Sequence, residues 1–354
     1  MKIDHCYQGD CRDVMRDLIA TGVRVQCIVT SPPYWGLRDY GVEGQLGLEP
    51  TLREFLDNMV EIFDLCRELL ADDGMLWLNM GDSYAGSRAA AGDTTTGNRG
   101  NTASKGMPSM VASRRRDDTP IPRSDVKVEG LKPKDLVGQP WRLAFALQDA
   151  GWWLRQAIIW HKPNPMPESV RDRCTKAHEY LFLLTKNERY YFDQDAIRTP
   201  YSAETKAQSF GTMDFKQRDT YRAAGNVRAA KGQAAYEAGD SRHRTKAGLL
   251  AYAEKTRENP VPMSGANRRS VWTVPTTPYP GAHFATFPEA LVEPCILAGS
   301  RLGDIVFDPF MGSGTVASVA QRLGRRWLGA ELNPDYIALQ AERTRQPALE
   351  LTAA

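Results

Sequence analysis

The tetrad Ser31-Pro32-Pro33-Tyr34, which follows the apolar run Val25–Thr30, places the tightest local constraint on this chain. The run predicts a buried strand, and two successive prolines prevent the backbone from continuing in that strand or entering a helix at once. The backbone beyond Thr30 is therefore expected to be stiff and extended. It presents a hydroxyl, carbonyl oxygens and an aromatic ring, which suit a flat ring with an exocyclic amine, such as cytosine or adenine. A proline-terminated strand with an ordinary packing tyrosine is the plainer interpretation.

The segment after the tetrad has the pattern of an α/β protein. Apolar residues recur at three-and-four spacing from Leu52 to Leu70, which predicts an amphipathic helix. Asp72-Asp73-Gly74 is expected to end this helix, and Met75–Met80 is expected to form the next strand. This β-α-β succession is typical of a mostly parallel sheet.

The same pattern returns further along the chain. The remaining predicted elements are the strands Trp152–Trp160, Tyr180–Thr185, Asp304–Phe307 and Arg326–Ala330 and the helices Pro140–Ala150, Pro288–Ala298, Gly314–Leu323 and Pro334–Arg345. No apolar stretch approaches the roughly 20 residues that a membrane span needs. The opening residues do not have the pattern of a signal peptide.

Two polar and basic segments interrupt the α/β pattern. The net charge of the whole chain is only +2, but residues 87–135 carry 10 Lys and Arg against 6 Asp and Glu, and residues 198–269 carry 14 against 7. Few large apolar residues lie in either segment, so long loops are expected rather than a packed core. The excess positive charge suits contact with nucleic-acid phosphates, whereas a solvated insert without that role is the alternative.

A second motif, Asp308–Thr315, has the sequence Asp-Pro-Phe-Met-Gly-Ser-Gly-Thr between a predicted strand and a predicted helix. Glycines at such a turn let the backbone approach a ligand closely. No lysine follows the second glycine, so the motif is not a P-loop, and only Gly-x-Gly of the dinucleotide fingerprint is present. Glu331 lies 19 residues beyond Gly312, where an acid accepts hydrogen bonds from ribose hydroxyls. The set predicts a nucleoside-binding half-sheet, against the alternative of a simple tight turn.

These motifs resemble those of one enzyme family. Thr30–Trp35 resembles the catalytic motif of the DNA amino-methyltransferases, which methylate exocyclic nitrogens with S-adenosylmethionine. Asp308–Thr315 resembles their cofactor loop, and Gly329–Asn333 resembles the segment that holds the ribose. Gly9-Asp10-Cys11 resembles the segment near the cofactor adenine, and His283–Pro288 resembles the strip that lines the methionine end. The tetrad comes first and the cofactor loop last, which is the order of the β class of this family.

The resemblance implies a Rossmann-like, doubly wound α/β fold with a mostly parallel methyltransferase sheet and inserted basic, loop-rich recognition segments. Five parts of the chain follow from it. They are a catalytic part of the core (1–85), a basic flexible insertion (86–135), a continuation of the core (136–197), a candidate target-recognition region (198–270) and an S-adenosylmethionine-binding part of the core (271–354).

The resemblance also assigns roles to residues. The catalytic set is Ser31, Pro32, Pro33 and Tyr34. The cofactor-binding set is Asp10, Cys11, Thr30, His283, Phe284, Thr286, Asp308, Phe310, Gly312, Ser313, Gly314, Thr315, Glu331, Leu332 and Asn333. Asp39 either assists proton loss or only pairs with Arg38. No metal site is expected, because Cys174 and His178 have ligand-like spacing but no second pair.

The expected reaction transfers a methyl group from S-adenosylmethionine to the N4 amine of cytosine in DNA. Serine at the first tetrad position favours cytosine, because family members with Asp or Asn there mostly modify the N6 amine of adenine, which is the alternative. A catalytically inactive DNA-binding protein with this fold is a third interpretation. Rate enhancement is expected to come from positioning and desolvation, since the amine lone pair is delocalised into its ring. The base must leave the duplex to reach the tetrad.

The expected partner is double-stranded DNA, with no membrane contact, and a cognate restriction endonuclease is left open. Monomer and homodimer both remain open. Six scattered cysteines without a Cys-x-x-Cys pair favour a reducing cytoplasm over a disulfide framework. We therefore expect a cytoplasmic protein that associates with the nucleoid when it binds DNA.

Overall fold

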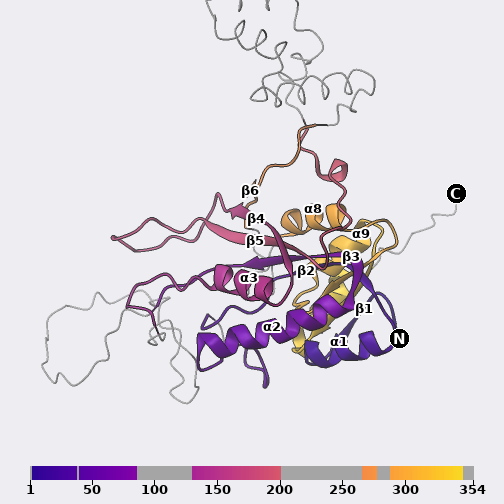
Figure 1. Cartoon of the computed structure of the whole chain (residues 1–354), viewed down its shortest axis with the longest axis horizontal. Coiled ribbons are helices and arrows are strands. Elements are labelled where there is room, and N and C mark those ends of the chain that lie inside the picture. The colour runs from indigo at the N-terminus through magenta and orange to yellow at the C-terminus, as the bar shows by residue number, and fades with distance from the viewer. Residues whose placement is uncertain (1, 38–39, 86–129, 201–264, 277–287, 346–354) are drawn as a thin grey trace, which may run out of the picture. The chain divides into compact units, whose positions relative to one another are not determined.

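The computed structural model describes residues 2–37, 40–85, 130–200, 265–276 and 288–345. Two compact units are present: residues 1–196 with 269–354, and residues 197–268. The first unit contains one eight-stranded sheet (Figure 1). The strand order is β1 (His5–Gln8), β8 (Arg326–Glu331), β7 (Ile305–Asp308), β2 (Val25–Thr30), β3 (Leu70–Met80), β5 (His178–Thr185), β4 (Trp153–His161) and β6 (Val271–Thr273).

The sheet is mostly parallel, as the sequence predicts. β2 pairs in parallel with β3 on one side and with β7 on the other, and β7, β8 and β1 continue in the same direction. β5 is antiparallel to both β3 and β4, and β6 pairs in parallel with β4. Strands from the two ends of the chain therefore lie side by side, and the carboxyl ends of β2 and β7 meet at one edge, where open α/β sheets bind ligands.

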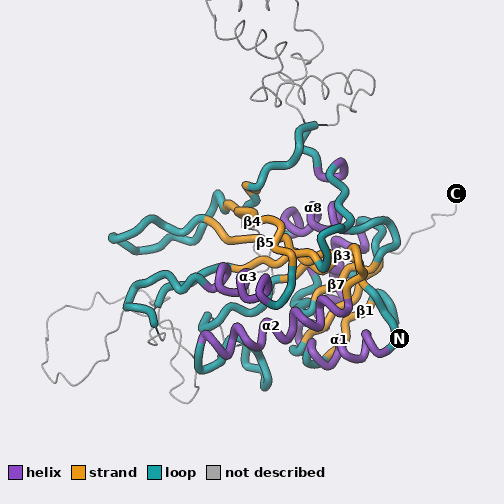
Figure 2. Tube along the Cα trace, viewed as in Figure 1, coloured by secondary structure: helices purple, strands orange, loops and turns teal. Residues whose placement is uncertain are grey.

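Helices cover both faces of the sheet (Figure 2). α1 (Cys11–Ala20), α2 (Leu52–Leu69) and α3 (Gln139–Asp149) pack in sequence on one face, and α8 (Glu289–Gly299) and α9 (Thr315–Arg322) cover the other. α10 (Pro334–Arg343) packs against α9, β1 and β8. A short 3-10 helix, η1, spans Asp195–Ile197. In the described chain, no helix is long and apolar enough to cross a membrane.

The core is built by the apolar stripe of α2 against the central strands. Phe55, Ile62 and Phe63 of this helix are fully buried, as are Ile28 of β2 and Leu76 of β3. Each such side chain contributes roughly 1.5–3 kcal/mol through burial. The helix begins where the sequence predicts, because the Thr51 hydroxyl accepts a hydrogen bond from the Glu54 amide at 3.2 Å.

All eleven predicted helices and strands are present, with ends that shift by a few residues. The largest correction concerns the end of α2. The helix stops at Leu69 and β3 begins at once with Leu70, so Asp72-Asp73-Gly74 lies within the strand and does not end the helix. Leu70 already pairs with Val25, and the register shifts before Cys27 pairs with Met75. The polar residues therefore lie in an irregular, bulged stretch of the β2–β3 pairing.

Four elements of the described chain escaped the sequence interpretation, namely β1, α1, η1 and β6. β1 and β6 have four and three residues, too few for a periodic signal. The basic insertion falls almost wholly on residues 86–129, outside the described chain, and the candidate target-recognition region is described only at its two ends. There, Thr199 and Ala266 exchange two backbone hydrogen bonds of 2.9 Å.

Candidate functional site

The two sequence motifs meet at the carboxyl ends of β2 and β7. The Thr30 hydroxyl donates a hydrogen bond of 2.6 Å to Asp308 Oδ1, and both side chains are buried. Thr30 is the last residue of β2 and Asp308 the last of β7. The tetrad and the glycine turn therefore begin side by side, as expected for two neighbouring strands of a doubly wound sheet.

The glycine turn between β7 and α9 is held from two sides. Gly312 and Gly314 have φ angles of 53° and 84°, which lie in the region that favours glycine. The Gly312 amide donates to Glu331 Oε2 at 2.7 Å, and Gln340 Nε2 donates to the Gly312 carbonyl at 2.6 Å. The other Glu331 oxygen accepts from the Asn333 amide at 2.8 Å. Glu331 thus fixes the turn while it remains partly exposed.

Asp308 carries an unused acceptor at the start of this turn. Its Oδ1 accepts from Thr30 and from the Phe310 amide, but its buried Oδ2 has no hydrogen-bond partner among the described residues. Burial raises the pKa of Asp308 to about 7, and hydrogen bonds from Thr30 and Phe310 oppose that shift. Burial also raises the pKa of Glu331. An unpartnered buried carboxylate oxygen suits a positively charged group of a ligand.

The tetrad lies against the ends of β3 and β5. Ser31 Oγ donates to Asn79 Oδ1 at 3.2 Å, and the Tyr34 hydroxyl donates to Glu179 Oε2 at 3.0 Å. Ser31 Oγ and the Tyr34 hydroxyl are 3.4 Å apart. Burial, followed by the charge of Glu179, raises the pKa of Tyr34 well above its usual value. The phenol therefore stays protonated at neutral pH.

A buried glutamine fixes the chain just after the tetrad. Gln139 Oε1 accepts from the Trp35 amide and Gln139 Nε2 donates to the Trp35 carbonyl, each at 3.1 Å. The Trp35 indole donates to the Glu49 carbonyl at 2.8 Å. On the other side of the tetrad, an added Cβ at Gly81 would lie 2.7 Å from the Tyr34 ring. The position of Tyr34 is thus set by packing as well as by hydrogen bonds.

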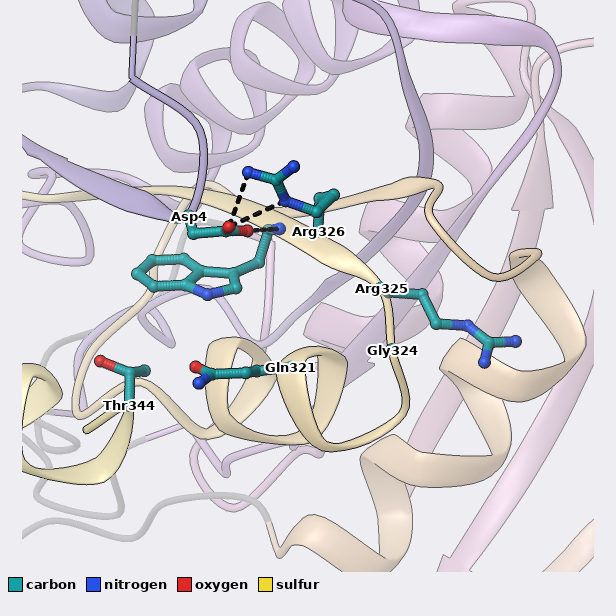
Figure 3. Close-up of a pocket in the computed structure, with 7 residues that line it drawn as sticks. Asp4, Gln321, Gly324, Arg325, Arg326 and Thr344 are labelled. Carbon is teal, nitrogen blue, oxygen red and sulfur yellow. Dashed lines mark hydrogen bonds and ion pairs between the residues drawn. The ribbon is translucent and has the colours of Figure 1, made fainter. Parts of the chain in front are cut away.

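A separate pocket of about 490 Å³ lies at the opposite end of β8 (Figure 3). Arg326, the first residue of that strand, pairs with Asp4 at 2.8 Å, and the Trp327 amide donates to Asp4 at 3.0 Å. Glu331 ends the same strand. This pocket is therefore removed from the tetrad and the glycine turn by the length of β8.

The family of the chain follows from comparison with known proteins. The family model N6_N4_Mtase, described as DNA methylase, matches residues 25–343, which include the tetrad and the glycine turn. The chain belongs to this DNA methylase family. The methyl donor of the family is S-adenosylmethionine, so the protein is an S-adenosylmethionine-dependent DNA methyltransferase.

Named relatives of the methylase match it over almost its whole length. It is 43% identical over 337 residues to Type II methyltransferase M.Cfr9I of Citrobacter freundii, and this alignment covers 95% of this chain and 86% of the relative. It is 42% identical over 335 residues to Type II methyltransferase M.SmaI of Serratia marcescens, with 95% and 88% coverage. The solved PvuII DNA methyltransferase (cytosine-N4-specific) has the same fold, with a TM-score of 0.55, 16% identity and coverage of 97% of this chain and 87% of that one.

The residues of the methylase fit this donor. The unpartnered Asp308 Oδ2 suits the ammonium group of the donor's methionine part, because that group is cationic. Glu331 is partly exposed and keeps acceptor capacity beyond its two amide bonds, which suits ribose hydroxyls. An added Cβ at Gly312 would have only the Phe310 carbonyl oxygen within 4 Å, at 3.9 Å, so the turn leaves open space there for a ligand.

Other predicted cofactor residues are occupied by contacts within the chain. Asp10 caps α1 through the Arg12 amide and pairs with the Arg12 guanidinium at 2.6 Å. The Gly9 amide donates to the Glu331 carbonyl at 2.9 Å, so this segment does lie beside the turn. Burial raises the pKa of Cys11 to about 12, so it packs as a neutral thiol. The cofactor contacts of Asp10 and Cys11 stay predictions.

Two more of the predicted cofactor residues, Ser313 and Thr315, are hydrogen-bonded to Arg343 of α10. Arg343 donates to Ser313 Oγ and Thr315 Oγ1, each at 3.0 Å, so those hydroxyls face the helix that packs behind the turn. Phe310 is partly buried against the core, and Leu332 and Asn333 are partly exposed after β8. The predicted residues His283, Phe284, Thr286 and Asp39 lie outside the described chain.

The sequence interpretation missed the polar residues that surround the tetrad. Asn79 and Glu179 contact it through the hydrogen bonds given above, and Gln139 contacts Trp35 directly after it. Lys162 forms an ion pair with Glu179. One signal was available in the sequence. Asn79 is a polar residue near the end of the apolar predicted strand Met75–Met80, and Glu179 directly precedes the predicted strand Tyr180–Thr185. A buried polar side chain at such a place needs a specific partner.

Proposed function

We propose that this methylase transfers the methyl group of S-adenosylmethionine to the N4 amine of cytosine in double-stranded DNA. The observation that carries the proposal is Ser31 at the first tetrad position, with its oxygen beside the Tyr34 hydroxyl and adjoining the glycine turn through Thr30 and Asp308. Serine at this position is typical of family members that modify cytosine. The solved neighbour named as cytosine-N4-specific shares only the fold and does not decide the base.

The tetrad supplies the groups that the amine needs. Ser31 Oγ and the Pro32 carbonyl accept the two amine hydrogens, which draws the nitrogen toward tetrahedral geometry and frees its lone pair. The ring of Tyr34 stacks on the base. As the positioned nitrogen forms its bond to the methyl group, the bond between that methyl and the sulfonium sulfur breaks and S-adenosylhomocysteine leaves. The resulting cationic amine then releases its extra proton to water. Positioning and desolvation supply most of the rate enhancement.

The glycine turn holds the donor in this proposal. Asp308 binds its ammonium group and Glu331 its ribose hydroxyls, while the backbone of the turn contacts its carboxylate. When bound, the donor supplies the electrophilic methyl group. Thr30 connects the two halves of the site, because its hydroxyl bonds Asp308 and its carbonyl leads into Ser31.

The target base must leave the duplex, since the tetrad cannot reach an amine inside the base stack. The basic segments within 86–135 and 198–270 are proposed to bind phosphates and to recognise the sequence, which makes binding dependent on salt. The relatives M.Cfr9I and M.SmaI are named Type II methyltransferases. We therefore propose that this protein also serves a restriction-modification system with a cognate endonuclease.

Labelled S-adenosylmethionine tests the proposal directly. Purified protein is incubated with the labelled donor and bacterial genomic DNA, and the DNA is digested to nucleosides that are separated by chromatography. Label in 4-methylcytosine supports the proposal. Label in N6-methyladenine would replace cytosine by adenine as the target, and absence of label from all DNA would leave a non-catalytic DNA-binding role.

A further inference from the structure

Behind the tetrad lies a chain of polar side chains that joins a cation to the catalytic serine. It begins at Lys162 of the loop between β4 and β5, which forms an ion pair with Glu179 Oε1 and lies 4.2 Å from the centroid of the Trp160 ring. Lys162 and Glu179 are only 19% and 16% exposed. An ammonium group can only donate and a carboxylate can only accept, so the direction of every hydrogen bond at Glu179 is fixed.

The other oxygen of Glu179 accepts hydrogen bonds from the tetrad and from its neighbour Asn79. Glu179 Oε2 accepts from the Tyr34 hydroxyl at 3.0 Å and from Asn79 Nδ2 at 3.3 Å. Asn79 Nδ2 also donates to the Tyr180 carbonyl at 3.1 Å. Two acceptors on one side of Asn79 fix its amide orientation, so its Oδ1 must face Ser31.

Ser31 is the last member of this chain. Its hydroxyl proton points to Asn79 Oδ1, 3.2 Å away. The Tyr34 hydroxyl lies 3.0 Å from Glu179 Oε2 and 3.4 Å from Asn79 Oδ1. The shorter bond, to the charged oxygen, takes the phenol proton and leaves Asn79 Oδ1 to accept from Ser31. The serine oxygen is thereby left with lone pairs and no proton to offer to a base in the site.

We propose that Glu179, with Lys162 and Asn79, is a positioning group that sets Ser31 as a hydrogen-bond acceptor and so selects a base with an amine over one with a carbonyl at the same place. This inference rests on the proposed function and deepens it. Cytosine and uracil differ there by an amine and a carbonyl oxygen. The cytosine amine meets two acceptors, Ser31 Oγ and the Pro32 carbonyl, whereas the uracil oxygen meets only repulsion.

The substitution Glu179→Gln tests this direction without changing the size of the side chain. Lys162 needs an acceptor, so it retains the carbonyl of the new side-chain amide and turns the NH₂ group of that amide toward Tyr34 and Asn79. That reverses the bonds behind Ser31. We expect kcat to fall about 10²-fold, as for loss of one aligned hydrogen bond in a transition state, while S-adenosylmethionine binding stays within about threefold.

Adding Lys162→Met to Glu179→Gln should restore the original direction of the hydrogen bonds behind Ser31. In the double variant K162M/E179Q the ammonium group that paired with Glu179 is absent, and the neighbouring Lys176 already donates to the Asp82 carbonyl at 2.6 Å. The carbonyl of the introduced amide therefore turns back to Tyr34 and Asn79. We expect at least about tenfold recovery of kcat over Glu179→Gln. The matched control K162M/E179L removes the acceptor and should stay slow. This pair decides the question even where Glu179→Gln alone fails to fold, because neither double variant leaves an unpaired charge at position 162 or 179.

Base selection is the readout that a purely structural role would not change. Binding is compared between duplexes that carry cytosine or uracil at the target position of the site identified with wild-type protein. Wild type should prefer cytosine, and Glu179→Gln should reduce that preference about tenfold. An unchanged preference with unchanged kcat, or equal activity of K162M/E179Q and K162M/E179L, would overturn the inference. If wild type itself methylates no DNA, the proposed function fails instead.

Discussion

The Thr30 hydroxyl donates a buried hydrogen bond of 2.6 Å to Asp308 Oδ1, and it joins the strand that ends in the tetrad to the strand that ends in the glycine turn. The two residues are 278 positions apart in the chain. Through this one contact the part of the site that holds the amine is aligned with the part that holds the methyl donor. Alignment of two reactants is the main source of rate in such a transfer.

Thr30→Val should remove the hydrogen bond that aligns these two parts of the site. The substitution keeps the shape of the side chain but removes the donor, so Asp308 is left with one amide bond in a buried position. We expect a loss of about 1–3 kcal/mol in the free energy of unfolding, measured by urea denaturation, together with slower methyl transfer. Thr30→Ser keeps the hydroxyl and is the control. Equal stability of the valine variant and wild type would show that the hydrogen bond makes no net contribution to the free energy of unfolding.

The raised pKa of Asp308 predicts how stability depends on pH. The folded protein keeps a proton on this carboxyl up to about pH 7, whereas the unfolded chain loses it near pH 4. The folded state binds more protons between these values. The contribution of protonated Asp308 to the free energy of unfolding is therefore complete below about pH 4 and is lost as the pH rises through 7.

Asp308→Asn, which does not titrate, provides the reference for that contribution. The unfolding free energy of donor-free wild type minus that of the variant should decrease by up to about 4 kcal/mol between pH 4 and pH 8. The difference cancels the titration of most other groups. A difference that stays constant across this range would mean that Asp308 is ionised throughout.

Ser31→Ala and Tyr34→Ala should retain donor binding but lose methyl transfer. The side chains of both residues face Asn79 and Glu179, and neither is hydrogen-bonded to the Asp308 or Glu331 carboxylates that are proposed to hold the donor. We expect a fall in kcat of about 10²–10³-fold, measured by transfer of label to DNA, and an unchanged Kd for S-adenosylmethionine by calorimetry. If both variants keep full activity, the tetrad is not the catalytic centre.

Gly314→Ala should damage the donor site through the backbone. Gly314 has φ of 84°, and an added Cβ would lie 3.0 Å from Gln340 Cγ. We expect a loss of about 1–3 kcal/mol in stability and weaker donor binding. Gly22 is a matched control, because it has φ of 78° but no atom within 4 Å of an added Cβ. Gly22→Ala should show the backbone strain alone and leave donor binding intact.

The sequence allows the periodic parts of this fold to be predicted, and it places the two motifs at strand ends. The stripe from Leu52 to Leu69 and the run Val25–Thr30 carry their own signals, because burial of one face imposes a period. Ser31 and Glu331 could be selected as candidates because Ser31 directly follows a strand and Glu331 ends one, each within a recognisable motif. Short strands such as β6 have too few residues for such a signal.

The polar network behind Ser31 could not be predicted in the same way. Glu179 reaches the tetrad only because β5 runs antiparallel beside β3, which pairs Tyr180 with Met80 and Leu181 with Asn79. Neither the direction of β5 nor its register is marked in the sequence around Glu179. Long-range strand pairing decides which buried polar groups meet, and a single sequence carries little local information about it.

Identification of the methylated base tests the central claim most directly. DNA is recovered from a bacterial host without cytosine-N4 or adenine-N6 methylation of its own that expresses either wild-type protein or Ser31→Ala, and its nucleosides are quantified by mass spectrometry. We predict 4-methylcytosine with wild type and none with Ser31→Ala. N6-methyladenine as the new base in the wild-type sample, or no methylated base in either sample, would contradict the account.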